Sequence, residues 1–255
     1  MMWAAVVFLL PEIILTIGAS ALLIFPVAGS RAAAQSAKWM TIGLLVITAG
    51  SVIACSWAVE RMDQSRLLSQ MFALDGFAIF FKLVLLAAVG MVVLLSDAFL
   101  HESRYSSWEY YSLLAFALCG MFFMASGVHL ISIYVGLELL SLSSYILAGY
   151  LKNEQKSTEA AMKYFVLGAV SSAILLYGMS LIYGVCGSLN LLAIDNAMST
   201  LIANDALMVG IVLLAGCSTI PVPGFSESMP GTVEKLNKVI GVPGSTTTAQ
   251  VDWES

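Results

Sequence analysis

Long runs of apolar residues, separated by short polar segments, make up most of this chain. A helix that crosses a membrane needs about 20 mainly apolar residues. Runs of that kind predict helices at about residues 3–26, 39–58, 76–95, 110–127, 129–150 and 159–185, with a shorter seventh run at 206–217. Each run is apolar nearly all round, which is typical of helices buried in a bilayer. The pattern predicts an all-α, polytopic transmembrane bundle of about six to seven helices.

Several local signals refine these helices. Pro11 either kinks the first helix or lies in its first turn. Asp75 is well placed to cap the start of the third helix. Gly168 and Ser172 form a pair of small residues one turn apart, which lets another helix approach closely. Loops are expected at 60–74, 97–108 and 186–195.

Composition supports a membrane protein. Of the 255 residues, 60% are hydrophobic and 11% are charged, whereas a soluble domain has about 45–50% apolar and about 25% charged residues. The mean hydropathy is +0.93. The net charge of −5 provides no basic patch, which argues against a nucleic-acid partner and leaves the lipid bilayer as the expected surrounding.

Cysteine spacing argues against a metal site or a disulfide framework. The 4 cysteines lie far apart in apolar runs, at Cys55, Cys119, Cys186 and Cys217. Iron–sulfur clusters need clustered thiolates, so we expect no metal, no cofactor and no redox centre in this chain. Free thiols of this kind usually serve as small packing residues.

The composition changes abruptly after Cys217. Residues 218–255 are rich in Pro, Gly, Ser and Thr, and such a segment builds neither a membrane span nor a core. We therefore expect a transmembrane domain at 1–217 and an atypical, disordered tail at 218–255.

Basic residues in the loops predict the orientation. Five lie in the loops after the first, third and fifth helices: Arg31, Lys38, Arg104, Lys152 and Lys156. The loops after the second, fourth and sixth helices hold Arg61 and Arg66 alone. By the positive-inside rule the first set is cytoplasmic, which places the N-terminus outside the cell. No Lys or Arg precedes the first helix, so it is expected to be a retained membrane helix rather than a signal peptide.

Glu138 is the most informative residue, because a charge at the bilayer centre costs at least about 2.5–3.5 kcal/mol. It lies near the middle of the fifth predicted helix and shares a face with Tyr134, Ser141 and Tyr145. Burial disfavours the charged carboxylate and a nearby lysine favours it. We predict a proton-carrying carboxylate; the alternative is a protonated Glu hydrogen-bonded at a helix interface.

Other charged residues in apolar runs are open to two interpretations. Lys163 follows Glu159 by one turn, which fits a surface ion pair or charges at the cytoplasmic mouth of a proton path. Lys82 is explained by a structural role or by snorkelling to the interface. Glu12, next to Pro11, is also explained by a helix start, and His129 is by default a loop or interface histidine that could instead relay protons.

Four stretches resemble the antiporter-like subunit N family of bacterial NADH:quinone oxidoreductase, or complex I. They are Leu10-Pro11-Glu12, Leu74-Asp-Gly-Phe-Ala-Ile-Phe-Phe-Lys82, Tyr134-Val-Gly-Leu-Glu-Leu-Leu-Ser-Leu-Ser-Ser-Tyr-Ile-Leu147 and Ser157-Thr-Glu-Ala-Ala-Met-Lys-Tyr-Phe-Val-Leu-Gly-Ala169. The resemblance covers about residues 1–216. It implies a fold of inverted helical repeats, of which this chain has the N-terminal half.

The resemblance also implies a function. Such a subunit belongs to the membrane arm of complex I and moves protons, while other subunits use NADH and quinone. In the family a Glu of the fifth helix pairs with a Lys of the seventh, and Glu138 matches that Glu. Glu159 and Lys163 match charged positions near it. The expected location is the bacterial inner membrane, and the expected partners are the other membrane-arm subunits.

The chain departs from the family pattern near Cys217. No Lys occurs between Lys163 and Lys235, so the expected seventh-helix lysine is absent. A frameshift or wrong splice near Cys217 is the hypothesis that this departure suggests, and the coding DNA tests it. Two other functions stay open, a cation/proton antiporter subunit and a structural membrane scaffold that does not pump.

Overall fold

Long helices account for nearly all of the chain that the computed structural model describes, namely residues 9–28, 34–59, 71–73, 75–102, 107–201 and 205–217. The helices are α2 (Leu10–Ala28), α3 (Ala34–Val59), α4 (Gly76–Glu102), α5 (Ser107–Ser126), α6 (Leu130–Ala148), α7 (Gln155–Cys186), α8 (Leu191–Leu201) and α9 (Asp205–Cys217). The prediction of an all-α fold is confirmed. The predicted tail at 218–255 lies outside the described residues, as do Arg31, Arg61, Arg66 and Arg104.

The prediction of a multi-pass membrane bundle is also confirmed. Among the described helices, α3 to α7 are long and apolar enough to cross a membrane, and α2 and α9 contribute shorter apolar stretches. Side chains of these helices that face outward are mainly apolar. This surface suits lipid or neighbouring helices rather than water.

Two predicted loops are partly helical. The loop expected at 97–108 is wrong in its first part, because α4 continues to Glu102; the segment contains no Gly or Pro to stop it. The loop expected at 186–195 is wrong in its second part, because α8 begins at Leu191. There the Asn190 side chain accepts a hydrogen bond from the Leu192 amide, and Ile194 belongs to a buried cluster with Ile182 and Leu207.

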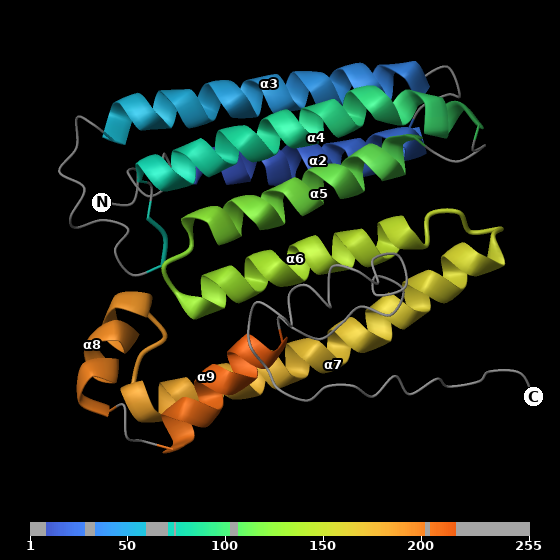
Figure 1. Cartoon of the computed structure of the whole chain (residues 1–255). Helices are drawn as coiled ribbons and strands as arrows, with labels where there is room; N and C mark the ends of the chain where they lie inside the picture. The colour runs from blue at the N-terminus through green and yellow to red at the C-terminus, as the bar shows by residue number, and fades with distance from the viewer. Residues whose placement is uncertain are drawn as a thin grey trace, which may run out of the picture. The chain divides into compact units, whose positions relative to one another are not determined.

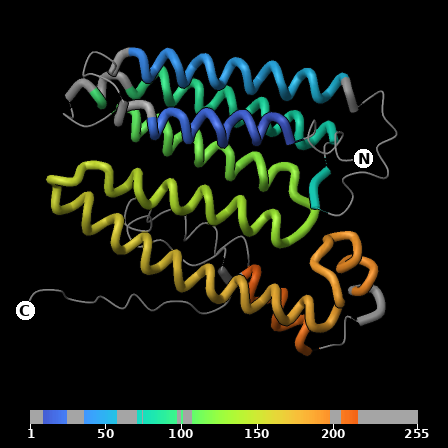
Figure 2. The backbone as a smooth tube through the Cα atoms, turned by 180° about the vertical axis from the view of Figure 1, so that it is seen from behind, coloured from blue at the N-terminus to red at the C-terminus, as the bar shows by residue number. Residues whose placement is uncertain are grey.

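Helix α5 is the centre of the arrangement and packs against α2, α3, α4 and α6 (Figure 1). Helices α6 and α7 lie side by side along their lengths in both views (Figure 2), and α9 packs on α7. Glycines allow the closest approach: a Cβ built on Gly120 of α5 would lie 2.5 Å from the Gly136 carbonyl oxygen of α6. Two helix backbones therefore touch where neither residue has a side chain.

Three connections meet at one end of the bundle. The Ala73 amide donates to the Ser126 carbonyl, and the Val128 amide donates to the Met71 carbonyl. On the other side, the Leu130 amide donates to Leu189. The connections after α3, α5 and α7 therefore share one end, as alternating membrane spans require. Here the prediction of an N-cap is confirmed, since Asp75 Oδ1 accepts from the Ala78 amide at 2.8 Å.

Candidate functional site

The Glu138 carboxylate lies between α6 and α7. Ser172 of α7 donates a hydrogen bond to Glu138 Oε1, and both residues are half-buried. Tyr134, one turn earlier on α6, hydrogen-bonds with both the Glu138 and the Ser172 side chains. An acidic group with two hydroxyl neighbours can accept a proton, hold it and pass it to a hydroxyl or to water.

Three of the four residues of the predicted polar stripe on α6 contact α7. Besides Tyr134 and Glu138, Tyr145 turns toward α7, where its ring contacts Phe165 with centroids 6.4 Å apart. Gly168 makes room for it, because any Cβ there would collide with the Tyr145 ring and hydroxyl. The small pair predicted at Gly168 and Ser172 thus lines the α6–α7 contact, and one of its members binds the carboxylate directly.

Lys163 and Glu159 pair with each other rather than with Glu138. Lys163 Nζ lies 2.6 Å from Glu159 Oε1, and the side chains are 66% and 57% exposed. Ser172 follows Lys163 by nine residues, which is about 13 Å along a helix. The structure therefore does not bring Lys163 and Glu138 together by way of α7. The geometry is that of the surface-type i, i+4 pair, and any role in a proton path stays a prediction.

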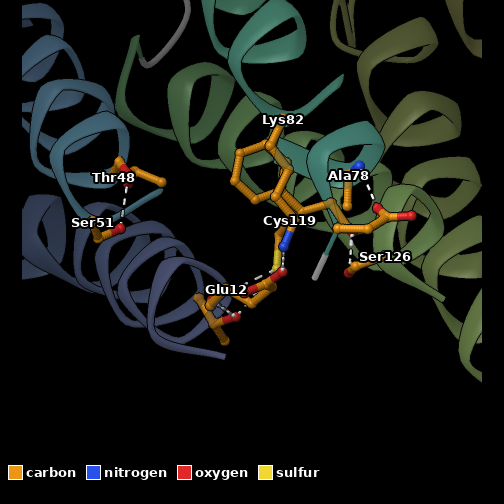
Figure 3. A network of polar contacts seen from close by, with 10 residues as sticks. Glu12, Thr48, Ser51, Ala78, Lys82, Cys119 and Ser126 are labelled. Carbon is orange, nitrogen blue, oxygen red and sulfur yellow. Dashed lines mark hydrogen bonds and ion pairs between the residues drawn. The ribbon is translucent and has the colours of Figure 1, made fainter. Parts of the chain in front are cut away.

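A second charged pair lies in the interior of the α2–α5 group (Figure 3). Lys82 Nζ of α4 lies 2.5 Å from Glu12 Oε1 of α2, and the side chains are 1% and 2% exposed. Snorkelling of Lys82 is therefore wrong: the side chain turns inward because an opposite charge offsets the cost of burial there. Glu12 lies in the first turn of α2, next to Pro11, as the second interpretation of Pro11 predicted.

Apart from Lys82, the hydrogen-bonding groups described near this pair do not reach the Glu12 carboxylate. Cys119 Sγ lies 3.8 Å from the Glu12 carbonyl oxygen, not from its carboxylate. Lys82 Nζ lies 5.5 Å from the centre of the Phe122 ring, a cation–π distance. Glu12 Oε2 is buried and has no hydrogen-bond partner among the described residues.

The remaining polar features are structural. His129 caps α6, and its Nδ1 accepts from the Ile131 amide at 3.3 Å, so the default interpretation of His129 as a turn residue fits. At the other end, Lys152 Nζ lies 3.6 Å from Glu109 Oε2. Burial, and then the Glu109 carboxylate, raise the pKa of Tyr150 there. Within the described residues no cluster of His, Cys, Asp and Glu could hold a metal ion.

Sequence reasoning missed the pairing of Glu12 with Lys82 and the bond from Ser172 to Glu138. A signal existed for the first: one acid and one base stand in separate apolar runs, and each needs a partner. For the second, the hydroxyl at Ser172 follows Gly168 on the small face of α7. The small residues of that face predicted a contact with another helix, but the sequence did not identify which helix.

Comparisons with known proteins agree with this architecture. A family model described as NADH:quinone oxidoreductase/Mrp antiporter, transmembrane, matches residues 127–226. NADH-quinone oxidoreductase subunit N 2 of Rhizobium meliloti is 37% identical over 238 residues, covering 90% of this chain and 49% of the relative. Subunit N of Parvibaculum lavamentivorans is 38% identical over 208 residues, covering 81% and 42%. The chain spans about half the length of the curated relatives it matches.

Solved structures show a similar fold. A chain of respiratory complex I from Thermus thermophilus with bound aureothin is 28% identical with a TM-score of 0.54, over 79% of this chain and 43% of that one. A chain of an archaeal membrane-bound sulfane sulfur reductase has a TM-score of 0.64 at 22% identity, over 84% of this chain and 43% of the other. The second likeness concerns the fold alone.

Proposed function

Because this chain belongs to the family of antiporter-like membrane subunits that includes NADH-quinone oxidoreductase subunit N, we propose that it moves protons as a membrane-arm subunit of an NADH:quinone oxidoreductase. The observation that carries the proposal is the Glu138 carboxyl, held between α6 and α7 by Ser172 and Tyr134. An ionisable group inside membrane helices is costly and is usually kept for transport.

The proposed role of Glu138 is to hold one proton at a time. A proton from water binds the carboxylate, which removes the charge that is costly in a medium of low dielectric constant. The hydroxyls of Ser172 and Tyr134 orient the carboxyl and offer both donors and acceptors to the next water. Electron transfer from NADH to quinone takes place in other subunits of the complex, so this chain supplies a proton path and no redox chemistry.

The setting of the subunit is part of the proposal. We expect a bacterial inner membrane, other membrane-arm subunits as partners, and the connections after α3, α5 and α7 on the periplasmic side. The charged connections after α2, α4 and α6 then face the cytoplasm, including Lys152 with its partner Glu109. Lys163 and Glu159, near the start of α7, lie toward the same side and could gather protons there.

Glu138→Gln in the chromosomal gene tests the proposal. Inverted membrane vesicles are supplied with NADH, and proton uptake is followed with a pH-sensitive dye. We expect uptake to fall by about a hundredfold or more, in the range of lost acid–base groups. Glu154→Gln is the matched control, because Glu154 is exposed in the connection before α7. Electron transfer from NADH to an artificial acceptor reports the amount of assembled complex.

The other outcomes separate the competing functions. Normal uptake with Glu138→Gln would mean that the carboxyl is only a hydrogen-bonded part of a scaffold. A cation/proton antiporter subunit is the second candidate, because the family model names that group too. In that case Na⁺ or K⁺ added to acidified vesicles would release protons without NADH, and Glu138→Gln would abolish the release.

A further inference from the structure

The Glu12–Lys82 pair lies among α2, α3, α4 and α5, whereas Glu138 lies between α6 and α7. We propose that Glu12 and Lys82 form a second, separate proton-exchange site. Both side chains are almost completely buried, and Nζ lies 2.5 Å from Oε1. At that separation one proton can belong to either atom, so the pair has a charged form and a neutral form.

The surroundings contain one feature that favours each form. Glu12 Oε2 has no partner among the described residues, and an unpaired carboxylate oxygen is costlier to bury than the carbonyl oxygen of a neutral acid. This favours the neutral pair. The Phe122 ring, whose centre lies 5.5 Å from Nζ, favours the ammonium form. The two contributions act in opposite directions, so each form has a contact that stabilises it.

The neighbouring titratable groups are thiols. Cys55 of α3 and Cys119 of α5 interact electrostatically with both members of the pair. Thr16 adds a hydroxyl on α2, which bonds to the Glu12 carbonyl at 2.8 Å. None of these contacts occupies Oε2, so this oxygen is the place where a water can deliver or accept a proton.

Two proton transfers describe the site. In the first, the Nζ–H bond of the Lys82 ammonium breaks as an Oε1–H bond forms, leaving a neutral amine and a neutral acid with no change in total charge. In the second, a hydronium ion gives its proton to the Glu12 carboxylate and leaves as water. The pair then holds one more positive charge until water removes that proton again.

Access from one end of the bundle is short. Lys82 follows Gly76, the first residue of α4, by six residues, which is about 9 Å along a helix. This is the end at which the connections after α3, α5 and α7 bond to one another. Water therefore enters the proposed site at this end, which is the nearer end of α4 to Lys82.

Infrared spectroscopy on the full chain in lipid nanodiscs tests the proposal. We expect a carboxylic-acid C=O stretching band that is lost in Glu12→Gln and persists in Glu138→Gln. The band should move to lower frequency when H₂O is replaced by D₂O, because its proton exchanges. If no such band depends on Glu12 at any pH, or the band does not move in D₂O, the pair is a fixed ion pair or a sealed one, and the proposal fails.

A second variant keeps the test decisive if Glu12→Gln does not fold. Lys82→Met removes the alternative proton carrier, so Glu12 should stay protonated and the acid band should grow relative to the wild type. An unchanged band would mean that Lys82 does not share the proton. A band that appears only in Lys82→Met would mean that the wild-type pair is permanently charged, and either result overturns the proposal.

Discussion

Ser172 on α7 donates a hydrogen bond to the carboxylate of Glu138 on α6, and the two residues are 34 positions apart in the chain. This bond joins α7 directly to the proposed proton carrier on α6. The same two spans also meet through the Tyr145–Phe165 ring contact and through a hydrogen bond from the Ser157 hydroxyl of α7 to the Ala148 carbonyl of α6.

Ser172→Ala removes this donor without adding volume. A hydrogen bond to a charged group contributes about 1.5–3 kcal/mol, so NADH-driven proton uptake should fall by about tenfold or more. Ser144→Ala is the control, since that exposed hydroxyl bonds only to the Leu140 carbonyl of its own helix. Equal uptake rates in the two variants would contradict a role for the Ser172 hydroxyl.

Gly168→Ala should weaken the α6–α7 contact. A Cβ there meets the Tyr145 side chain, and overpacking costs about 1–3 kcal/mol. Thermal unfolding followed by circular dichroism in detergent should therefore occur at a lower temperature. Gly184→Ala on the same helix, where a Cβ meets nothing within 4 Å, should leave the midpoint unchanged or raise it.

Tyr145→Phe combined with Gly168→Ala sharpens that test. The Tyr145 hydroxyl is the atom nearest to the added Cβ, so its removal should restore part of the lost stability. If the double variant were no more stable than Gly168→Ala alone, the loss of stability would not come from a clash with the Tyr145 hydroxyl.

Glu12 and Lys82 should depend on each other for stability. Lys82→Met or Glu12→Leu alone leaves a buried polar group without its partner, which costs about 3–5 kcal/mol when that group is charged. The double variant removes both groups and should be closer to the wild type than either single variant. Unfolding in denaturant measures the free energy of unfolding of the two single variants and the double variant. If the loss in the double variant equals the sum of the two single losses, the two residues do not stabilise each other.

The proposed orientation can be read from thiol labelling. Glu154→Cys lies in an exposed connection before α7, and Gly76→Cys lies at the opposite end, where a Cβ has open space. A membrane-impermeant maleimide added to spheroplasts should label Gly76→Cys, whereas Glu154→Cys should react only after lysis. The reverse labelling pattern would mean that the orientation is inverted, with Lys152 on the periplasmic side.

Much of the fold follows from the sequence because a bilayer leaves few choices. Runs such as 76–95 must form helices, since only a helix bonds all its backbone groups within one segment. The Asp75 cap was predictable for a different reason: its hydrogen bond is local and reaches only three residues along the chain. Helix α8 was missed because it is short and follows a polar turn. The length of an apolar run, which predicts the membrane spans, does not predict a helix of this kind.

The sequence by itself determined that Glu138, Glu12 and Lys82 stand in apolar surroundings, because that depends only on neighbours along the chain. Tertiary structure alone decided which groups they meet. Lys82 could have snorkelled, but α3 and α5 hold α2 and α4 so that its Nζ reaches Glu12. A charge buried in low dielectric must find a partner, and which one it finds depends on packing between helices far apart in sequence.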